Sequence, residues 1–303
     1  MDIKKARINT LSMVQDLLPS RVKVLANNLR IAPSYFSWFS NSSWRKHTAE
    51  DVQPFFNKFI GCRCIIIGNG PSLREMDLQK LQDEFTFGLN RFYLMFRKLN
   101  FETTFFVAIN RLVIEQFGKE ISVIKGPKFI NWAYRKHVPI TSKTIYLPAK
   151  PTFRMSGNIN KGYYGMAGTV TNVALEIAFY MGFSEVILIG VDHSFGESGR
   201  ASLAVVSGGE DKNHFDPSYF GKGVVWQLPD YLAMERGYKQ AKELFGRAGR
   251  IIVDATKQGK LNVFPKVHFD NYLDQSSFLN RRSFLLAEGG KKAYGFEKIL
   301  EIV

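Results

Sequence analysis

Hydrophobic positions after residue 63 alternate between short apolar runs and longer segments with helical periodicity. The short runs are rich in β-branched and aromatic residues, as is typical of strands buried in a sheet. They predict seven strands, at 64–67, 85–89, 105–109, 128–130, 144–147, 186–189 and 250–253. Helical periodicity covers 75–82, 111–122, 170–181 and 230–247. This alternation predicts an α/β fold, a single Rossmann-like domain with a mainly parallel sheet.

Changes in hydrophobic periodicity and charge along the chain suggest three regions. Residues 1–58 form a basic helical extension of two short helices and a linker, 59–275 form the Rossmann-like domain, and 276–303 form a basic C-terminal tail. A segment at about 195–226 lacks periodicity and is expected to be a lid. The extension carries five aromatic residues beside Arg45 and Lys46, which are Tyr35, Phe36, Trp38, Phe39 and Trp44. They suit either packing on the domain or a lipid interface, and we favour packing.

Composition narrows the class of protein. With 303 residues, 45% of them hydrophobic, the chain can bury a full core without disulfides. Cys62 and Cys64 stand two apart on a predicted strand, where they share a face but lack both bridging geometry and the CxxC spacing. No secretory signal is expected from the charged start, and no apolar run approaches about 18 residues. A cytoplasmic protein is therefore expected.

The formal net charge of +14 predicts anionic partners. Nucleotide phosphates, acidic glycans, anionic lipid surfaces and nucleic acid all fit this charge. No nucleic-acid-binding module is recognisable, so a nucleic-acid partner is not expected. Peripheral contact with an anionic membrane stays open beside the simpler interpretation that the basic residues form solvated helix faces.

Polar residues follow four of the predicted strands directly. Gly68-Asn69-Gly70 follows the first, Asn90 the second, Asn110 the third, and Gly190-Val191-Asp192 the strand at 186–189. In an open parallel sheet the ligand crevice lies outside the carboxyl ends of the strands. The sequence therefore predicts that these residues converge on one crevice.

The loop from Gly68 to Leu73 has the composition of an anion-binding turn. Gly68 and Gly70 allow backbone N–H groups to approach a phosphate or carboxylate closely, and Ser72 can cap a following helix. The loop is neither a Walker loop nor a Gly-x-Gly-x-x-Gly fingerprint. An ordinary strand-to-helix turn is the alternative.

The other strand ends and one helix start offer neutral or anionic hydrogen-bonding groups. Asn90 and Asn110 can recognise a base or ribose, or simply form turns. Asp192 can accept from ribose hydroxyls or cap a turn. Gly168 and Thr169 open the helix at 170–181, whose N-terminus suits an anion, although capping alone explains the same residues.

Candidate catalytic chemistry lies in the predicted lid. His214 can remove a proton from an acceptor hydroxyl, with Asp216 orienting it or simply sharing the loop. A structural histidine is the alternative. No metal-ligand cluster has useful spacing, and no Asp-x-Asp follows a strand, so no metal site is expected. This favours a monophosphate-linked sugar donor, which needs no metal clamp.

Several of these motifs together resemble the CMP-sialic-acid-dependent lipooligosaccharide sialyltransferases of mucosal bacteria. The resemblance spans about 63–225 and rests on Ile66 to Leu73, Asn90-Arg91-Phe92-Tyr93, Asn110 and Gly190-Val191-Asp192. It implies a metal-independent, inverting transfer with His214 as the base, a glycan acceptor and a homo-oligomer. No cofactor is implied beyond the CMP-sugar substrate. Donor binding is implied for Asn69, Gly70, Asn90, Asn110, Thr169 and Asp192.

The sequence departs from that family in one respect. The family holds the donor phosphate with tyrosines after the aspartate, whereas this chain has His193-Ser194-Phe195. Phosphate binding through His193, Ser194 or Arg200 is the expectation that follows.

The same core resembles a second group, the domain shared by flagellin-modifying accessory proteins and archaeal 6-hydroxymethylpterin diphosphokinases. That group also has a Gly-Pro-Ser-Leu loop and an aspartate after a late strand. The resemblance implies an ATP-dependent diphosphotransferase that uses magnesium, and a non-catalytic nucleotide-binding module is a third alternative. Asn90 and Asn110 stand where a magnesium-binding carboxylate would be useful, which counts against the kinase.

Overall fold

The protein is described by a computed structural model over residues 20–196 and 199–289. Its centre is a seven-stranded sheet in which every neighbouring pair is parallel, in the order β11-β8-β1-β2-β3-β4-β5. The strands are β1 (Arg63–Ile67), β2 (Phe85–Leu89), β3 (Phe105–Ala108), β4 (Lys128–Asn131), β5 (Thr144–Leu147), β8 (Glu185–Ile189) and β11 (Ile251–Asp254). The α/β fold and all seven predicted strands are confirmed.

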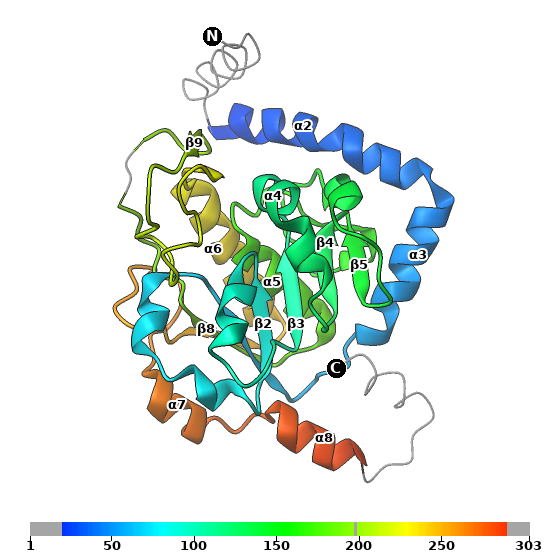
Figure 1. The fold of residues 1–303 in the computed structure, drawn as a ribbon. Helices are drawn as coiled ribbons and strands as arrows, with labels where there is room; N and C mark the ends of the chain where they lie inside the picture. Colours follow the sequence, from blue (N-terminus) through cyan, green and yellow to red (C-terminus); the bar gives the residue numbers. More distant parts are fainter. Residues whose placement is uncertain (1–19, 197–198, 290–303) are drawn as a thin grey trace.

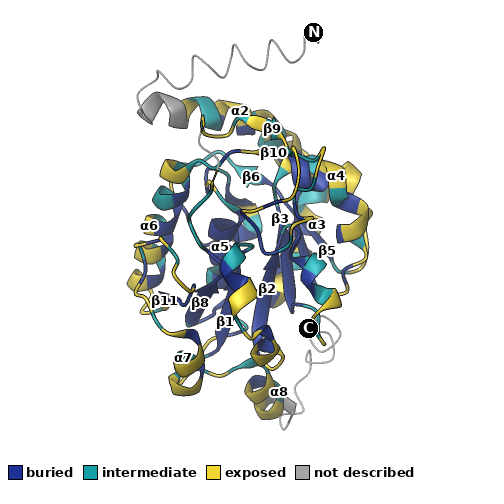
Figure 2. Ribbon diagram, turned by 60° about the vertical axis from the view of Figure 1, so that its left-hand side comes forward, coloured by how far each residue is buried: buried dark blue, intermediate teal, exposed yellow. Residues whose placement is uncertain are grey.

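The strands are continuous apolar runs because both faces of the sheet are covered. Alternate residues of β1 belong to different cores, Ile66 facing α5 (Val170–Met181) and Ile67 facing the opposite side. The first core also contains α6 (Tyr231–Arg247), and α4 (Arg111–Ser122) packs on the other face. Figure 2 shows the buried strands at the centre and exposed residues on outer helices such as α4 and α6. This burial on both sides is what a parallel sheet requires.

The strand order reverses at β1. From β1 the chain adds β2 to β5 outward on one side, and it later adds β8 and β11 on the other side. The crevice at such a switch point, outside the carboxyl ends of the strands, is where open α/β sheets bind ligands. Here the switch point lies between Ile67 of β1 and Ile189 of β8, which are paired in register.

One predicted helix is wrong. The segment 75–82 forms no α-helix but parts of two 3-10 turns, η2 (Pro71–Glu75) and η3 (Leu78–Leu81). Pro71 opens the first turn, and Met76 and Asp77 have extended backbone between the two. The apolar residues Leu73, Leu78 and Leu81 are nevertheless buried. The periodic pattern therefore indicated which residues are buried, but not that they form a continuous helix.

The N-terminal extension wraps around the domain instead of hanging from it. Helix α2 (Ser20–Ser40) lies across the end of the molecule, α3 (Ser42–Val52) runs down its side, and η1 (Gln53–Phe55) follows (Figure 1). Trp38 is buried and its indole N–H donates to Thr48, so part of the aromatic set packs as expected. Phe36 and Phe39 stay exposed on α2. Residues 1–19 lie outside the described part of the chain.

The C-terminal segment is also part of the fold. Helices α7 (Phe269–Gln275) and α8 (Arg281–Gly289) lie at the amino ends of the strands, where Arg63 N–H donates to the carbonyl of Leu279. Phe284 of α8 packs against Phe59 and Phe85 in the core. The predicted tail is therefore structured up to 289, and 290–303 lie outside the described residues. None of the described helices is long and apolar enough to cross a membrane.

The remaining elements are short. They comprise η4 (Phe92–Arg97), η5 (Trp132–His137), η6 (Ile159–Lys161), the two-stranded pair β6 (Ala149–Lys150) and β7 (Tyr163–Tyr164), and the hairpin of β9 (Ala204–Val206) and β10 (Val225–Gln227). The hairpin belongs to the segment predicted as a lid, and it crosses the carboxyl end of the sheet.

Candidate functional site

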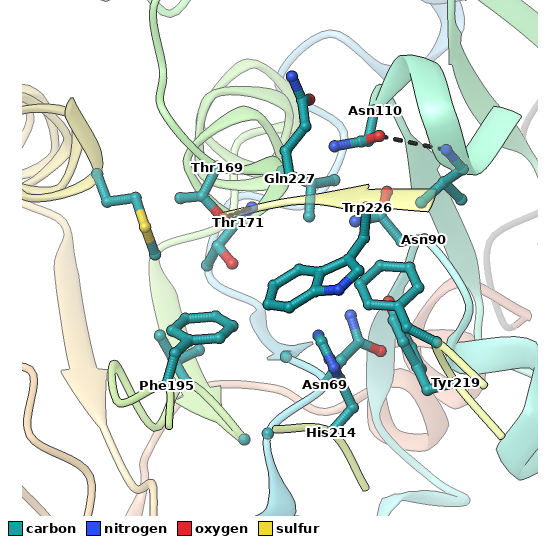
Figure 3. Close-up of a pocket in the computed structure, with 18 of the residues that line it drawn as sticks. Asn69, Asn90, Asn110, Thr169, Thr171, Phe195, His214, Tyr219, Trp226 and Gln227 are labelled. Atoms are coloured by element: carbon teal, nitrogen blue, oxygen red, sulfur yellow. Dashed lines mark hydrogen bonds between the residues drawn. The ribbon is translucent and has the colours of Figure 1, made fainter. Parts of the chain in front are cut away.

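A pocket lies at the switch point of the sheet, where the strand ends and the hairpin enclose it (Figure 3). Seven of the predicted site residues line it: Gly68, Asn69, Gly70, Asn90, Asn110, Thr169 and His214. Four predicted residues do not, and these are Ser72, Gly168, Asp192 and Asp216. The structure thus brings together residues from four strand ends and from the predicted lid.

The glycines of the first loop serve packing, and the expected phosphate cradle is not formed by their amides. The N–H groups of Gly68 and Gly70 donate to the carbonyls of Ile189 and Gly190. A Cβ at Gly68 would lie 2.2 Å from the Gly190 oxygen, so only glycine allows the ends of β1 and β8 to meet this closely. The two N–H groups are therefore not available to a ligand.

Ser72 and Asp192 hold each other outside the pocket. The Asp192 carboxylate accepts hydrogen bonds from the Ser72 N–H at 3.1 Å and from its hydroxyl at 2.8 Å. Ser72 is therefore not the predicted cap, since Gly70 occupies the N-cap position without a side-chain bond. Burial raises the pKa of Asp192, although the bonds from Ser72 oppose the shift. This pair ties the loop to the end of β8.

Asn69 and Asn90 line the pocket, and each has a buried side-chain oxygen. The Asn69 amide nitrogen donates to the carbonyl of Leu89, which fixes its orientation. The side-chain oxygens of both residues are buried and lack a hydrogen-bond partner. Asn90 has a φ of 51°, a conformation that asparagine tolerates better than most residues. Buried acceptors of this kind cost stability unless a ligand satisfies them.

Two α-helices begin at the pocket. Asn110 is the N-cap of α4 and accepts from Val113 N–H, while Thr169 is the N-cap of α5 and accepts from Thr171 N–H. The capping alternative is thus confirmed for Thr169, and Asn110 is a helix cap where a simple turn was the alternative, but each residue also lines the pocket. Gly168, with a φ of 74°, lets the first turn of α6 pack closely against this start of α5. The positive ends of two helix dipoles therefore face the same space.

His214 is oriented by Asp211, not by Asp216. Its Nδ1 lies 2.7 Å from the Asp211 carboxylate, and its ring stacks on Tyr219 with centroids 4.0 Å apart. With Nδ1–H donating to the carboxylate, Nε2 is left as the nitrogen that can accept a proton. Burial, the largest single contribution, raises the pKa of Asp211, but the bond and charge of His214 together with the backbone N–H groups of Asn213 and Phe220 outweigh it and lower the pKa.

Asp216 serves a local turn. Its carboxylate accepts from the N–H and the hydroxyl of Ser218, at 2.9 and 2.7 Å. These two bonds fix the turn that precedes Tyr219. The predicted role of Asp216 as the orienting group therefore passes to Asp211.

Two arginines clamp the segment that carries His214. Arg74 donates to the backbone carbonyls of His214 and Phe215, at 2.7 and 2.9 Å. Arg91 stacks on Phe117 and donates to the carbonyls of Ser218 and Tyr219. The segment 211–220 is consequently a fixed part of the site, whereas the lid interpretation suits the hairpin.

The β9–β10 hairpin forms the roof of the pocket. Trp226 of β10 projects toward the His214 ring, as Figure 3 shows, and stacks on Phe220 with centroids 5.5 Å apart. Gln116 of α4 both donates to and accepts from the backbone of Val225. This pair of hydrogen bonds holds β10 over the start of α4.

Several lining residues were not among the predicted site residues. They are Leu112, Val113, Val170, Thr171, Gly190, Val191, His193, Phe195, Tyr219, Phe220, Trp226, Gln227, Met234 and Tyr238. His193 has a sequence signal, since it follows Asp192 at a strand end, where the sequence predicts phosphate binding. Tyr238 had none, because its spacing on α6 is that of an ordinary core residue.

The pocket is lined by neutral groups. None of its described lining residues is Asp, Glu, Lys or Arg, and its only titratable residues are two histidines and two tyrosines. Within the described ranges, no group of three or more His, Cys, Asp or Glu side chains has the geometry of a metal site. The arrangement can bind a polar ligand through amides, hydroxyls and helix N-termini, and it places one oriented histidine beside that ligand.

The fold and the position of this pocket define an α/β protein of the Rossmann-like class with a ligand site at its switch point. Residues 40–198, just over half of the chain, match the model of the family described as 6-hydroxymethylpterin diphosphokinase MptE-like. The chain belongs to that family. The matched range contains the Gly68 loop, both asparagine strand ends and His193, and it stops before His214. No curated protein and no solved structure matches the chain.

Proposed function

We propose that this protein is a glycosyltransferase that moves an acidic sugar from a CMP-activated donor to a hydroxyl of a surface-glycan or lipopolysaccharide-type acceptor. The observation that carries the proposal is the His214–Asp211 pair, which is built into a pocket of otherwise neutral groups. An oriented imidazole beside a sugar-nucleotide site suits general-base catalysis.

The proposed reaction is an inverting displacement. Nε2 of His214 takes the proton of the acceptor hydroxyl while that oxygen bonds to the anomeric carbon of the donor sugar. The bond between the anomeric carbon and the phosphate oxygen breaks, and its electron pair leaves with CMP. Asp211 holds Nδ1–H and stabilises the imidazolium that forms.

The asparagine oxygens support a cytosine base. The unpartnered carbonyl oxygens of Asn69 and Asn90 are hydrogen-bond acceptors, and cytosine presents an exocyclic amino group as a donor. Uracil presents a carbonyl oxygen at the same position. A cytidine nucleotide therefore fits these two side chains better than a uridine nucleotide.

The electrostatics support a monophosphate-linked donor. The leaving phosphate gains charge in the transition state, and the N-termini of α4 and α5 are placed to stabilise that charge. A nucleotide diphosphate leaving group is usually held through a divalent cation, which takes carboxylate ligands. The lining residues supply no carboxylate for such a cation.

The family to which the chain belongs supports a second candidate, the ATP-dependent transfer of diphosphate to a pterin. The observation that favours this candidate most is that the family match over 40–198 covers most of the strand ends that form the pocket. This reaction depends on magnesium bridging the phosphates of ATP. Dependence on magnesium therefore separates the two candidates.

A thermal-shift titration with CMP, CDP, UDP, GDP and ATP, each with and without magnesium, tests the proposal. A ligand at about 100 times its dissociation constant adds roughly 2.7 kcal/mol of stability. The transferase proposal predicts that CMP alone stabilises the protein and does so without magnesium. Turnover assays with CMP-sugars would follow that result. Stabilisation by ATP with magnesium alone would transfer the assignment to the diphosphokinase, and no response to any of the five would indicate a non-catalytic role.

A further inference from the structure

A second histidine–carboxylate pair borders the same pocket. His193 follows β8, and its Nε2 lies 3.3 Å from the Glu235 carboxylate on α6. Its side chain is 7% exposed and its ring meets Tyr231 edge-on, with centroids 4.9 Å apart. The backbone at His193 has a φ of 52°, which a non-glycine residue rarely adopts. The chain thus accepts an unfavourable conformation that places this ring at the pocket.

The other nitrogen of His193 has no partner. Nδ1 is buried and makes no hydrogen bond, although His193 lines the pocket. Tyr238, fully buried on α6, also borders the pocket, and its hydroxyl makes no hydrogen bond of normal geometry. Burial raises the pKa of Tyr238, so the hydroxyl stays protonated and can donate. A buried imidazole nitrogen without a partner and a buried hydroxyl without a well-formed hydrogen bond therefore lie at one pocket, on different elements.

The start of α5 completes the arrangement. The hydroxyls of Thr171 and Thr169 lie near the Tyr238 hydroxyl, and Gly168 packs the first turn of α6 against this helix end. Helix α5 has 12 residues, and the N-terminus of a helix favours anions. In Figure 3, Thr169 and Thr171 lie on one side of the Trp226 indole, and Asn90 lies on the other. The side chain of Asn90 and the start of α5 therefore lie in different parts of the pocket.

We propose that His193, Tyr238 and the N-terminus of α5 form the phosphate subsite of the pocket, with Glu235 as a positioning residue for His193. The ligand is the phosphate of a nucleotide, monoester or diester, whose base reaches Asn69 and Asn90. The protonated imidazole donates from Nδ1 to a phosphate oxygen while Nε2–H donates to Glu235. This proposal rests on the proposed function only in taking the ligand to be a nucleotide.

The test measures how much the phosphate adds to affinity. Dissociation constants are measured by calorimetry for two pairs, cytidine with CMP and adenosine with ADP. The variants are His193→Gln, whose amide can keep the bond to Glu235 but lacks a group at Nδ1, and Glu235→Gln. Exposed Glu243, two turns along α6, supplies Glu243→Gln as the matched control. Thermal unfolding without ligand verifies that each variant folds.

We expect CMP to bind the wild-type protein at least about tenfold more tightly than cytidine, since charge-assisted hydrogen bonds contribute this much. His193→Gln and Glu235→Gln should each remove most of that ratio and leave cytidine affinity unchanged, while Glu243→Gln keeps it. A ratio retained in both variants, or absent from both nucleotide pairs in the wild type, overturns the subsite. A His193-dependent ratio for the adenine pair alone supports the subsite and sinks the cytidine-based function.

Discussion

At the amino and carboxyl ends of the parallel strands (the amino edge and the carboxyl edge of the sheet), several buried polar groups are treated differently. At the amino edge, Arg63 and Glu84 form a buried bidentate ion pair. The buried Lys128 ammonium there donates to the carbonyls of Ile124 and Gly126. At the carboxyl edge, the side-chain oxygens of Asn69 and Asn90 have no hydrogen-bond partner. The same holds nearby for Nδ1 of His193 and for the hydroxyl of Tyr238.

This difference separates stability from binding. Charged groups buried at the amino edge are tolerable only because they are paired, and breaking a pair leaves an isolated charge. Unpartnered groups at the carboxyl edge cost free energy, and a ligand that satisfied them would recover it. Substitutions at the two edges should therefore have separable effects, one on unfolding and one on ligand affinity or turnover.

The largest effect is expected for His214→Asn. Asparagine can still bond to Asp211 at the position of Nδ1 but lacks the nitrogen that accepts a proton. Turnover with a CMP-sugar should fall by about 10²- to 10⁴-fold, the range of general-base catalysis, with CMP affinity unchanged. Steady-state kinetics and calorimetry measure the two quantities, and a variant that keeps wild-type kcat would show that His214 is structural.

Next in size is Glu84→Gln at the amino edge. Loss of the carboxylate leaves Arg63 buried without its counter-charge, and the free energy of unfolding should fall by about 3–5 kcal/mol. Urea unfolding measures the change. Asp83→Asn is the control, because the neighbouring pair with Arg282 is exposed and should contribute at most about 1 kcal/mol. If the folded Glu84→Gln variant bound CMP more weakly, the effects on stability and on ligand binding would not be separable in this way.

A smaller effect is expected for Asn90→Gly. Glycine accepts the left-handed backbone at this position and removes the unpartnered amide. The affinity for CMP should fall about tenfold, the contribution of one hydrogen bond to a base, while the stability of the ligand-free protein stays within about 0.5 kcal/mol. An affinity that does not change would place the base elsewhere in the pocket.

The smallest expected effect is the acid sensitivity of the His214 segment. The pKa of Asp211 is lowered in the folded protein because His214 and the backbone N–H groups of Asn213 and Phe220 together outweigh burial, which is the largest single contribution. A lowered pKa contributes stability above the unfolded value, near pH 4, and that stability is lost as the pH falls through the folded value. Asp211→Asn should therefore flatten the loss of stability on acidification below about pH 4, whereas exposed Asp274→Asn should not. Parallel unfolding curves for both variants would contradict this.

The fold could be predicted because the sheet is buried on both faces. Each strand is then a continuous apolar run, and the seven predicted runs coincide with the seven strands to within about one residue at each end. The convergence of strand ends could be predicted for the same reason, since parallel strands end at one edge. The two 3-10 turns could not be predicted, because they bury the same leucines as a helix at 75–82 would.

The details of the site needed the three-dimensional structure. Asp211 and Asp216 both lie near His214 in an aperiodic segment, and the sequence contains nothing that identifies the one whose carboxylate turns toward the ring. The amides of Gly68 and Gly70 are taken by the end of β8, which is adjacent only through the crossover. Glu235 and Tyr238 reach the pocket from a helix whose periodicity indicates only packing.

The clamp of Arg74 and Arg91 has a consequence for how this site can change. Both arginines bond to backbone carbonyls of 211–220, so the backbone around His214 is held in addition to the contacts that Asp211 and Tyr219 make with its ring. The neighbouring hairpin that carries Trp226 can then be exchanged, shortened or recoded while the base stays in place. Under the proposed function, the base and the surface that selects the acceptor would lie on separate segments, and grafting a new β9–β10 hairpin would change acceptor specificity while the 211–220 segment keeps its clamp.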